Sequence, residues 1–271
     1  SDVGMKREHN EDSYLLLPEL NAFVVADGMG GHAGGEMASG VSVRTIERFV
    51  QENRQLIAPD ASYDGPVDQS PVARLASDAV REACRAVYRK SQEIRELENM
   101  GTTTVLSLYH QEYLFLGHVG DSRAYLIRDG HIAQLTDDHS LVNEQLKAGL
   151  ITEQQAQTSR FKNIITRSVG FEEDVDVDVI VVEIRPGDAI LLCSDGLSGL
   201  VTDKEINEIV NENFLSKSPE LLVNLANERG GDDNITVILS YISDGSEEAW
   251  DHTPDTPPPS TLGGASFNAG G

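Results

Sequence analysis

The order of strand-like and helix-like segments constrains the fold of this 271-residue chain more than any other feature of its sequence. A strand-type run at residues 23–27 (FVVAD) is followed by two segments with apolar residues at helical spacing, about residues 36–53 and 70–94. Three strand-like segments then follow with short connections: 103–109, 113–119 and 122–135. Because short connections join antiparallel strands, and because two helices precede the second strand, this order argues against a parallel βαβ sheet.

The second half of the chain repeats this mixture of strands and paired helices. A polar, helical insertion at about residues 139–168 precedes a strand-like segment, 174–184, in which acidic and apolar residues alternate. We interpret its acids, Asp174, Asp176 and Asp178, as the solvated face of that strand. A strand at 188–193, two helices and a last strand at 234–242 complete the pattern. We therefore predict an α+β fold, a four-layer α/β/β/α sandwich of two mostly antiparallel sheets flanked by helix pairs.

The composition changes near the C-terminus. Residues 244–271 contain acids, prolines and glycines but no Lys or Arg. Such a segment has too few apolar residues to form a core, so we expect a disordered tail there and one folded domain over residues 1–243.

The charge excludes several kinds of partner. The chain has 45 Asp and Glu against 21 Lys and Arg, a formal net charge of −24, which repels nucleic acid and anionic lipid but attracts cations. No apolar run approaches the roughly 20 residues of a membrane helix. Cys84 and Cys193 fit neither a zinc site nor a disulfide framework. We expect a cytoplasmic protein with no nucleic-acid or membrane partner.

A glycine cluster follows the first strand, in ADGMGGHAGG at residues 26–35. The spacing of Gly28, Gly30 and Ala33 formally matches a dinucleotide-binding fingerprint. Two features disfavour that interpretation: a second long helix precedes the next strand, and Asp27 would face a pyrophosphate. A nucleotide-binding protein is therefore a minor alternative, tested by whether a dinucleotide raises the melting temperature.

Aspartates stand at the ends of four strand-like segments: Asp27, Asp121, Asp195 and Asp233. A single Asp-Gly pair usually marks a turn, which is our interpretation of Asp129-Gly130. Asp27 and Asp195, however, follow apolar runs of buried type, where an unpaired charge is costly. Oxygen ligands without thiolates or paired histidines favour Mg²⁺ or Mn²⁺, so we predict a shared metal site.

Seven short motifs follow one another along residues 1–242: RxxNED, ADGMGGHAGGEMAS, GTTTV, HVGDSRAY, DDHS, LLCSDGL and GGDDNITVI. Together they resemble the metal-dependent (PPM, type 2C) serine/threonine protein phosphatases in their bacterial form. The resemblance implies a β-sandwich with a metal cluster at one end. It also identifies the insertion at about 139–168 as a mobile flap beside the active site.

The resemblance implies metal ligands for two Mn²⁺ or Mg²⁺ ions, with a third ion in bacterial members: Asp27, Gly28, Asp195, Asp233, Glu11, Asp12 and Asp121. Asp27 would bridge two ions, and the carbonyl of Gly28 would bind one of them. Asp195 and Asp233 would complete the coordination of the first ion, while Glu11 and Asp12 would hold the second ion through water. Asp121, with Asp195, would form the third site.

The implied reaction is hydrolysis of phosphoserine and phosphothreonine by direct attack of a metal-bridging water or hydroxide. Phosphorylated proteins would be the partners, including a serine/threonine kinase and its substrates. The alternative is an inactive phosphopeptide-binding module, which is disfavoured because every metal carboxylate of the family is present.

Three further residues have implied or candidate catalytic roles. By resemblance, Arg7 would bind the substrate phosphate and Asn234 would orient the water. Many eukaryotic members have a histidine after the Asp-Gly pair, where this chain has Met29. His32 is our candidate general acid, although it could equally orient a ligand carboxylate or cap the following helix.

Overall fold

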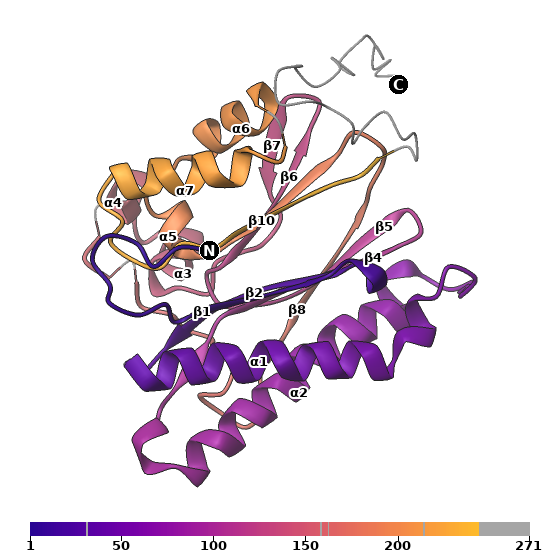
Figure 1. The fold of residues 1–271 in the computed structure, drawn as a ribbon, viewed down its shortest axis with the longest axis horizontal. Helices are drawn as coiled ribbons and strands as arrows, with labels where there is room; N and C mark the ends of the chain where they lie inside the picture. The colour runs from indigo at the N-terminus through magenta and orange to yellow at the C-terminus, as the bar shows by residue number, and fades with distance from the viewer. Residues whose placement is uncertain (31, 158, 162, 214, 244–271) are drawn as a thin grey trace.

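The computed structural model describes residues 1–30, 32–157, 159–161, 163–213 and 215–243. Two antiparallel sheets face each other, and helices cover the outer side of each (Figure 1). The predicted four-layer α+β sandwich is confirmed. The expected tail at 244–271 lies outside the described residues.

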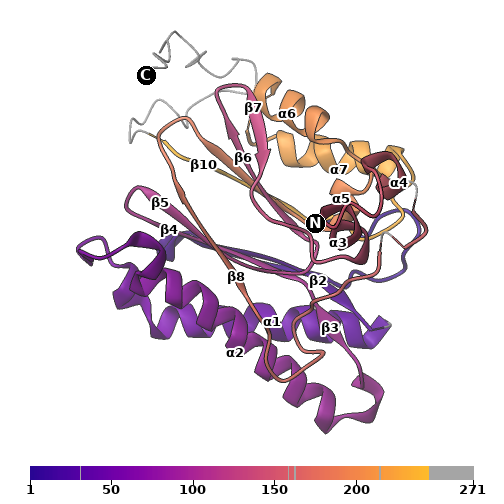
Figure 2. The same ribbon diagram turned by 180° about the vertical axis from the view of Figure 1, so that it is seen from behind.

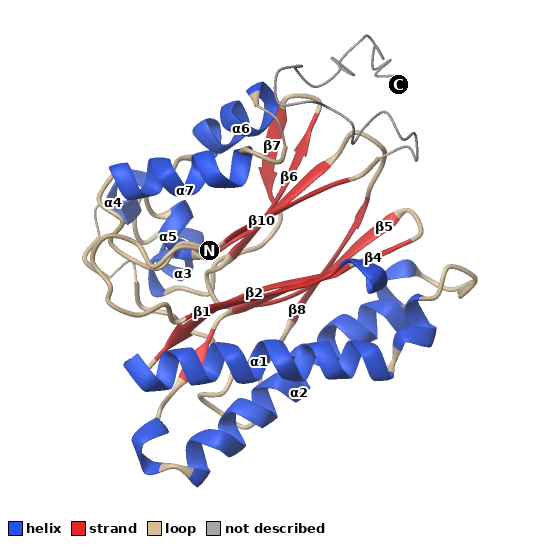
Figure 3. Cartoon of the chain, in the orientation of Figure 1, coloured by secondary structure: helices blue, strands red, loops and turns tan. Residues whose placement is uncertain are grey.

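The first sheet has six strands, in the order β1-β2-β4-β5-β8, with β3 paired to the end of β2. Its strands are β1 (Asp12–Leu17), β2 (Ala22–Met29), β3 (Gly101–Thr102), β4 (Thr104–His110), β5 (Tyr113–Val119) and β8 (Asp178–Glu183). Helices α1 (His32–Glu52) and α2 (Pro71–Glu93) pack on its outer face and share a buried core with it (Figure 3).

The second sheet has four strands, in the order β10-β9-β6-β7: β6 (Arg123–Arg128), β7 (His131–Gln134), β9 (Ala189–Cys193) and β10 (Val237–Tyr241). Three helices lie on its outer side: α5 (Asp195–Ser198), α6 (Asp203–Glu212) and α7 (Ser218–Glu228). A smaller apolar core fills the space between the sheets.

The predicted insertion is helical, with α3 (Leu141–Lys147) and α4 (Glu153–Gln157) at the end of the second sheet (Figure 2). Short 3₁₀ turns lie in the connections: Pro18–Leu20, Arg54–Ile57, Val67–Gln69 and Arg95–Leu97. Among the residues that the structure describes, no helix has the length and apolar character needed to cross a bilayer.

Local sequence explains where several elements begin and turn. Ser70 caps α2 by accepting from the backbone N–H of Ala73. Thr202 and Glu205 form a reciprocal capping box at α6. The hairpin between β6 and β7 turns at Asp129-Gly130, where both φ angles are positive, 52° and 75°.

Two expectations about strands were incomplete. Strand β1 was not anticipated, because its short run DSYLLL lies at the sheet edge and leaves Tyr14 and Leu16 half exposed. The strand expected from residue 174 begins only at Asp178, and the residues before it turn away to line a pocket.

Candidate active site

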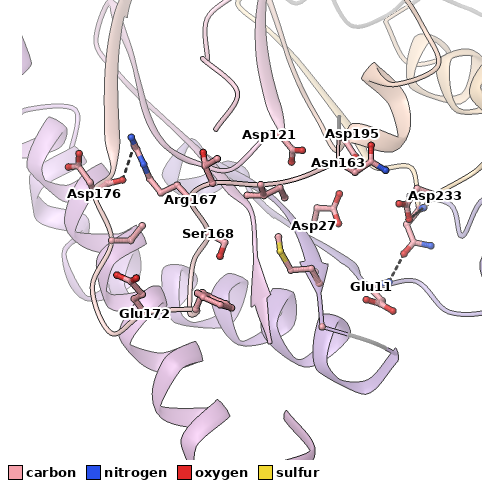
Figure 4. Close-up of a pocket in the computed structure, with 18 of the residues that line it drawn as sticks. Glu11, Asp27, Asp121, Asn163, Arg167, Ser168, Glu172, Asp176, Asp195 and Asp233 are labelled. Carbon is pink, nitrogen blue, oxygen red and sulfur yellow. Dashed lines mark hydrogen bonds between the residues drawn. The ribbon is translucent and has the colours of Figure 1, made fainter. Parts of the chain in front are cut away.

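The four strand-end aspartates converge on one pocket of about 700 Å³ (Figure 4). Asp27 lies in β2 and Asp121 follows β5, so both come from the first sheet. Asp195 begins α5 just after β9, and Asp233 precedes β10, so both come from the second sheet. Glu11, just before β1, also lines the pocket. Both sheets therefore contribute carboxylates to one site.

The glycine cluster allows close packing around Asp27. A Cβ on Gly28 would lie 2.1 Å from the carbonyl oxygen of Gly35 and 2.5 Å from that of Glu11. A Cβ on Gly35 would lie 1.9 Å from a carboxylate oxygen of Glu11. The start of α1, the end of β2 and the segment before β1 can thus meet only through glycine.

The GTTTV motif holds the backbone of Asp27 on both sides. The N–H of Asp27 donates to Thr103 Oγ1 at 2.9 Å, while its carbonyl accepts from Thr102 Oγ1 and from the N–H of Thr103, both at 2.8 Å. Thr103 Oγ1 also lies 2.7 Å from Ser122 Oγ, next to Asp121. These threonines fix the positions of both aspartates.

Two of the pocket carboxylates, Asp27 and Asp121, have raised pKa values. Burial, together with repulsion from Asp12, Asp195, Asp121 and Asp233, raises the pKa of Asp27 well above 3.8. Burial, and then repulsion from Asp195, raises the pKa of Asp121 to about 7. Clustered acids of this kind are stabilised by divalent cations, and all-oxygen donors suit Mg²⁺ or Mn²⁺.

Asp12 differs from the other acids in its hydrogen bonds. It lies opposite Asp27 in the β1–β2 pair, yet its Oδ2 accepts from Ser194 Oγ at 2.8 Å and from Thr236 Oγ1 at 2.7 Å. Burial raises its pKa to about 6 despite these two hydrogen bonds. Asp12 therefore joins the first sheet to the second.

Arg7 and Asn234 both line the pocket. Arg7 is half exposed and forms an ion pair with Asp233, with Nη2 and Oδ2 2.7 Å apart. Asn234 Oδ1 accepts from the N–H of Glu11 at 2.7 Å, and Nδ2 donates to the carbonyls of Val3 and His9. Both amide hydrogens are used, so the side chain holds the backbone before β1, and its Oδ1 keeps a second lone pair that can accept a hydrogen bond.

The candidate general acid is only partly located. His32 begins α1, but its side chain lies outside the described residues. Met29, which occupies the position after the Asp-Gly pair, lines the pocket.

Sequence reasoning placed the insertion at about 139–168 beside the active site but did not identify the residues that form the pocket wall opposite the carboxylates. Residues after α4 and before β8 form this wall: Asn163, Ile165, Thr166, Arg167, Ser168, Phe171, Glu172, Asp174, Val175 and Asp176. Cys84 of α2 fixes it, because the N–H of Gly170 donates to Sγ and Sγ lies 3.2 Å from the carbonyl of Glu172. The alternating acids were interpreted as a solvated strand face, but Asp174 and Asp176 line the pocket instead.

A second group of potential metal ligands lies outside this pocket. His118, His139 and Asp178 have ligand atoms within 4.8 Å of one another. Their hydrogen bonds to Ser122, Gly120 and one another indicate a structural network.

Comparison with known proteins decides the family. The model of the family described as Protein phosphatase 2C matches residues 6–240. The chain belongs to the protein phosphatase 2C family. The predicted family, fold class and enzyme class are thereby confirmed: the chain is a metal-dependent protein serine/threonine phosphatase.

Relatives of this protein phosphatase 2C domain are bacterial. Serine/threonine phosphatase stp of Listeria monocytogenes is 35% identical over 243 residues, covering 88% of this chain and 92% of the relative. Protein phosphatase PhpP of Streptococcus pneumoniae is 37% identical, covering 92% and 98%.

Solved structures agree with this assignment. The Mycobacterium tuberculosis serine/threonine phosphatase PstP/Ppp has a TM-score of 0.77 and 34% identity, covering 89% of this chain and 96% of that one. A second structure, the catalytic domain of PstP in complex with two manganese ions, has a TM-score of 0.75 and 34% identity, covering 90% and 96%. These matches favour the active phosphatase over the inactive binding module.

Proposed function

We propose that residues 1–243 form a catalytic domain that hydrolyses phosphoserine and phosphothreonine in proteins, using two Mn²⁺ or Mg²⁺ ions. The observation that carries this proposal is the convergence of buried carboxylates from both sheets on one pocket, with raised pKa values at Asp27 and Asp121. Bound cations would compensate the mutual repulsion and the burial of these carboxylates.

The donor set fits the ions. Asp27, Asp195 and Asp233, with the carbonyl of Gly28, would hold them, and Glu11 and Asp12 would act through water. Asp121 with Asp195 would provide a third site. When bound, the ions supply an activated water and neutralise charge on the phosphoryl group.

Arg7 has the chemistry to bind the phosphate. Its guanidinium offers parallel donors that match two phosphoryl oxygens, and its ion pair with Asp233 orients it at the pocket. We propose that it binds the equatorial oxygens, whose charge phosphoryl transfer must stabilise. His32 at the start of α1 stays our candidate for protonating the leaving serine or threonine oxygen.

Asn234 would orient the water through its Oδ1, and it also positions Glu11. Its amide fixes the backbone of Glu11 and thereby the segment that carries the proposed second-ion ligands. The physiological partners would be phosphorylated proteins of the cytoplasm, including a serine/threonine kinase and its substrates.

Hydrolysis of para-nitrophenyl phosphate and of a phosphothreonine peptide tests the proposal. We expect turnover with Mn²⁺ and none with chelator, and Asp27→Asn and Asp195→Asn should each lower kcat at least about 100-fold, as loss of a metal ligand does. Asp60→Asn, at an exposed position away from the pocket, is the matched control. A protein that Mn²⁺ stabilises thermally but that shows no turnover would instead be a phosphopeptide-binding module.

A further inference from the structure

His139, the first residue of the flap, connects three segments around the active site. Its backbone N–H donates to the carbonyl of Gly120 at 2.8 Å, and its carbonyl accepts from the N–H of Thr166 at 2.9 Å. Its ring Nδ1 accepts from the N–H of Gly120 at 3.0 Å, and Nε2 lies 3.1 Å from Asp178 Oδ2. The side chain is buried.

These contacts fix the tautomer of the ring. A backbone N–H can only donate, so Nδ1 accepts the hydrogen bond from Gly120 and carries no hydrogen. Nε2 therefore carries the ring hydrogen and donates it to Asp178. The ring thus has no lone pair facing the carboxylate, which argues against a metal ion between His118, His139 and Asp178.

The network continues from Asp178 to the pocket wall. The second carboxylate oxygen of Asp178 accepts from Arg167 Nη1 at 2.6 Å. Arg167 Nη1 also donates to the carbonyl of Asp176, as Figure 4 shows. Arg167, Thr166 and Asp176 all line the pocket, so this end of the network defines the wall.

The other end of the network reaches the carboxylate cluster. Gly120 directly precedes Asp121 and has a φ of 111°. A Cβ there would lie 2.6 Å from Thr103 Cβ, so the loop is tightly packed. The two ring nitrogens of His139 therefore act on opposite sides of the pocket, Nδ1 on the Asp121 loop and Nε2 on the wall.

We propose that His139 is a positioning residue with two separable roles. Through Nδ1 it holds Asp121 in place for metal binding, and through Nε2 and Asp178 it holds the wall that contacts the phosphoprotein. The proposal rests on the proposed function, in which Asp121 is a metal ligand.

Two substitutions separate the roles. In His139→Asn, Oδ1 can replace Nδ1 as the acceptor for Gly120, but the side chain is too short to reach Asp178. In His139→Gln, the longer amide can reach Asp178, but the acceptor for Gly120 is lost. Mn²⁺ affinity, measured by calorimetry, and kcat and KM for both substrates, para-nitrophenyl phosphate and the phosphothreonine peptide, are the readouts.

The two variants should show opposite patterns. We expect His139→Gln to weaken the weakest Mn²⁺ site about tenfold, as loss of a ligand's supporting partner does. We expect His139→Asn to bind Mn²⁺ within about twofold of wild type but to raise KM for the peptide about tenfold, with little change for para-nitrophenyl phosphate. Asp178→Asn should resemble His139→Asn, and combining the two should add little.

The exposed histidine of β7 provides the control, since His131→Asn should change none of these values. Equal effects of His139→Asn and His139→Gln on both readouts, or no effect of either, would overturn the proposal. If the His139 variants do not fold, an unchanged peptide KM in Asp178→Asn would overturn the role of the wall. A wild-type protein that neither binds Mn²⁺ nor turns over would instead reject the proposed function.

Discussion

Replacing Asp121 by asparagine should stabilise the metal-free protein at neutral and alkaline pH. Burial and neighbouring acids raise the pKa of Asp121 from 3.8 to about 7 in the folded state. An acid with a raised folded-state pKa binds protons more tightly when folded, so the fold loses stability as pH rises from about 4 to about 7. A difference of roughly three pH units corresponds to about 4 kcal/mol, since each tenfold change in proton affinity is worth about 1.4 kcal/mol.

Urea unfolding followed by circular dichroism, with chelator present, measures this effect. The free energies of unfolding of wild type and Asp121→Asn should be similar near pH 4 and should differ by about 4 kcal/mol at pH 8, with the variant more stable. Asp60→Asn serves as the control at an exposed site. Parallel pH profiles for wild type and Asp121→Asn would show that this carboxyl is not the titrating group.

Addition of Mn²⁺ should narrow this difference. Free Mn²⁺ at 100 times its dissociation constant would stabilise wild type by about 2.7 kcal/mol per site. Asp121→Asn should gain less because one ligand is lost. An equal gain in both proteins would mean that Asp121 contributes nothing to metal binding.

Two further predictions concern the same pocket. Gly28→Ala should destabilise the fold by about 3 kcal/mol, because the new methyl would overlap the backbone of Gly35, whereas Gly40→Ala in α1 meets only the flexible end of Arg44 and should be neutral or slightly stabilising. Similar melting temperatures for these two variants would contradict the close-approach argument. Arg7→Ala should lower kcat/KM for the phosphothreonine peptide at least tenfold, as expected for loss of a charge-assisted phosphate contact, and Lys6→Ala should not; an unchanged kcat/KM in Arg7→Ala would remove Arg7 from substrate binding.

The features that the sequence predicted well are those set by local chemistry. Helix starts follow from Ser70 and Thr202, and the hairpin follows from Asp129-Gly130, because each depends on residues within a few positions. The four aspartates were recognisable because buried strands that end in acids are uncommon without a partner.

The features that the sequence could not predict depend on contacts between distant residues. The side-chain amide of Asn234 forms hydrogen bonds with the backbone of Val3, His9 and Glu11, which lie more than 200 positions away in the sequence. Asp178 was assigned to a solvated strand face because alternation indicates only which side of the strand a residue faces. It does not indicate that Arg167 and His139 form hydrogen bonds with Asp178 on that side. Hydrogen-bond partners of this kind leave no periodic signal.

The position of β8 has a consequence for how the chain could be divided. This strand follows the helical insertion in sequence, yet it returns to the first sheet beside β5. In the second sheet, β9 pairs with β6, and β10 pairs with β9. A backbone cut within the flap would therefore give two fragments that each supply strands to both sheets. Asp27 and Asp121 would lie on one fragment and Asp195 and Asp233 on the other, so only reassociation of the two pieces would reconstitute the site.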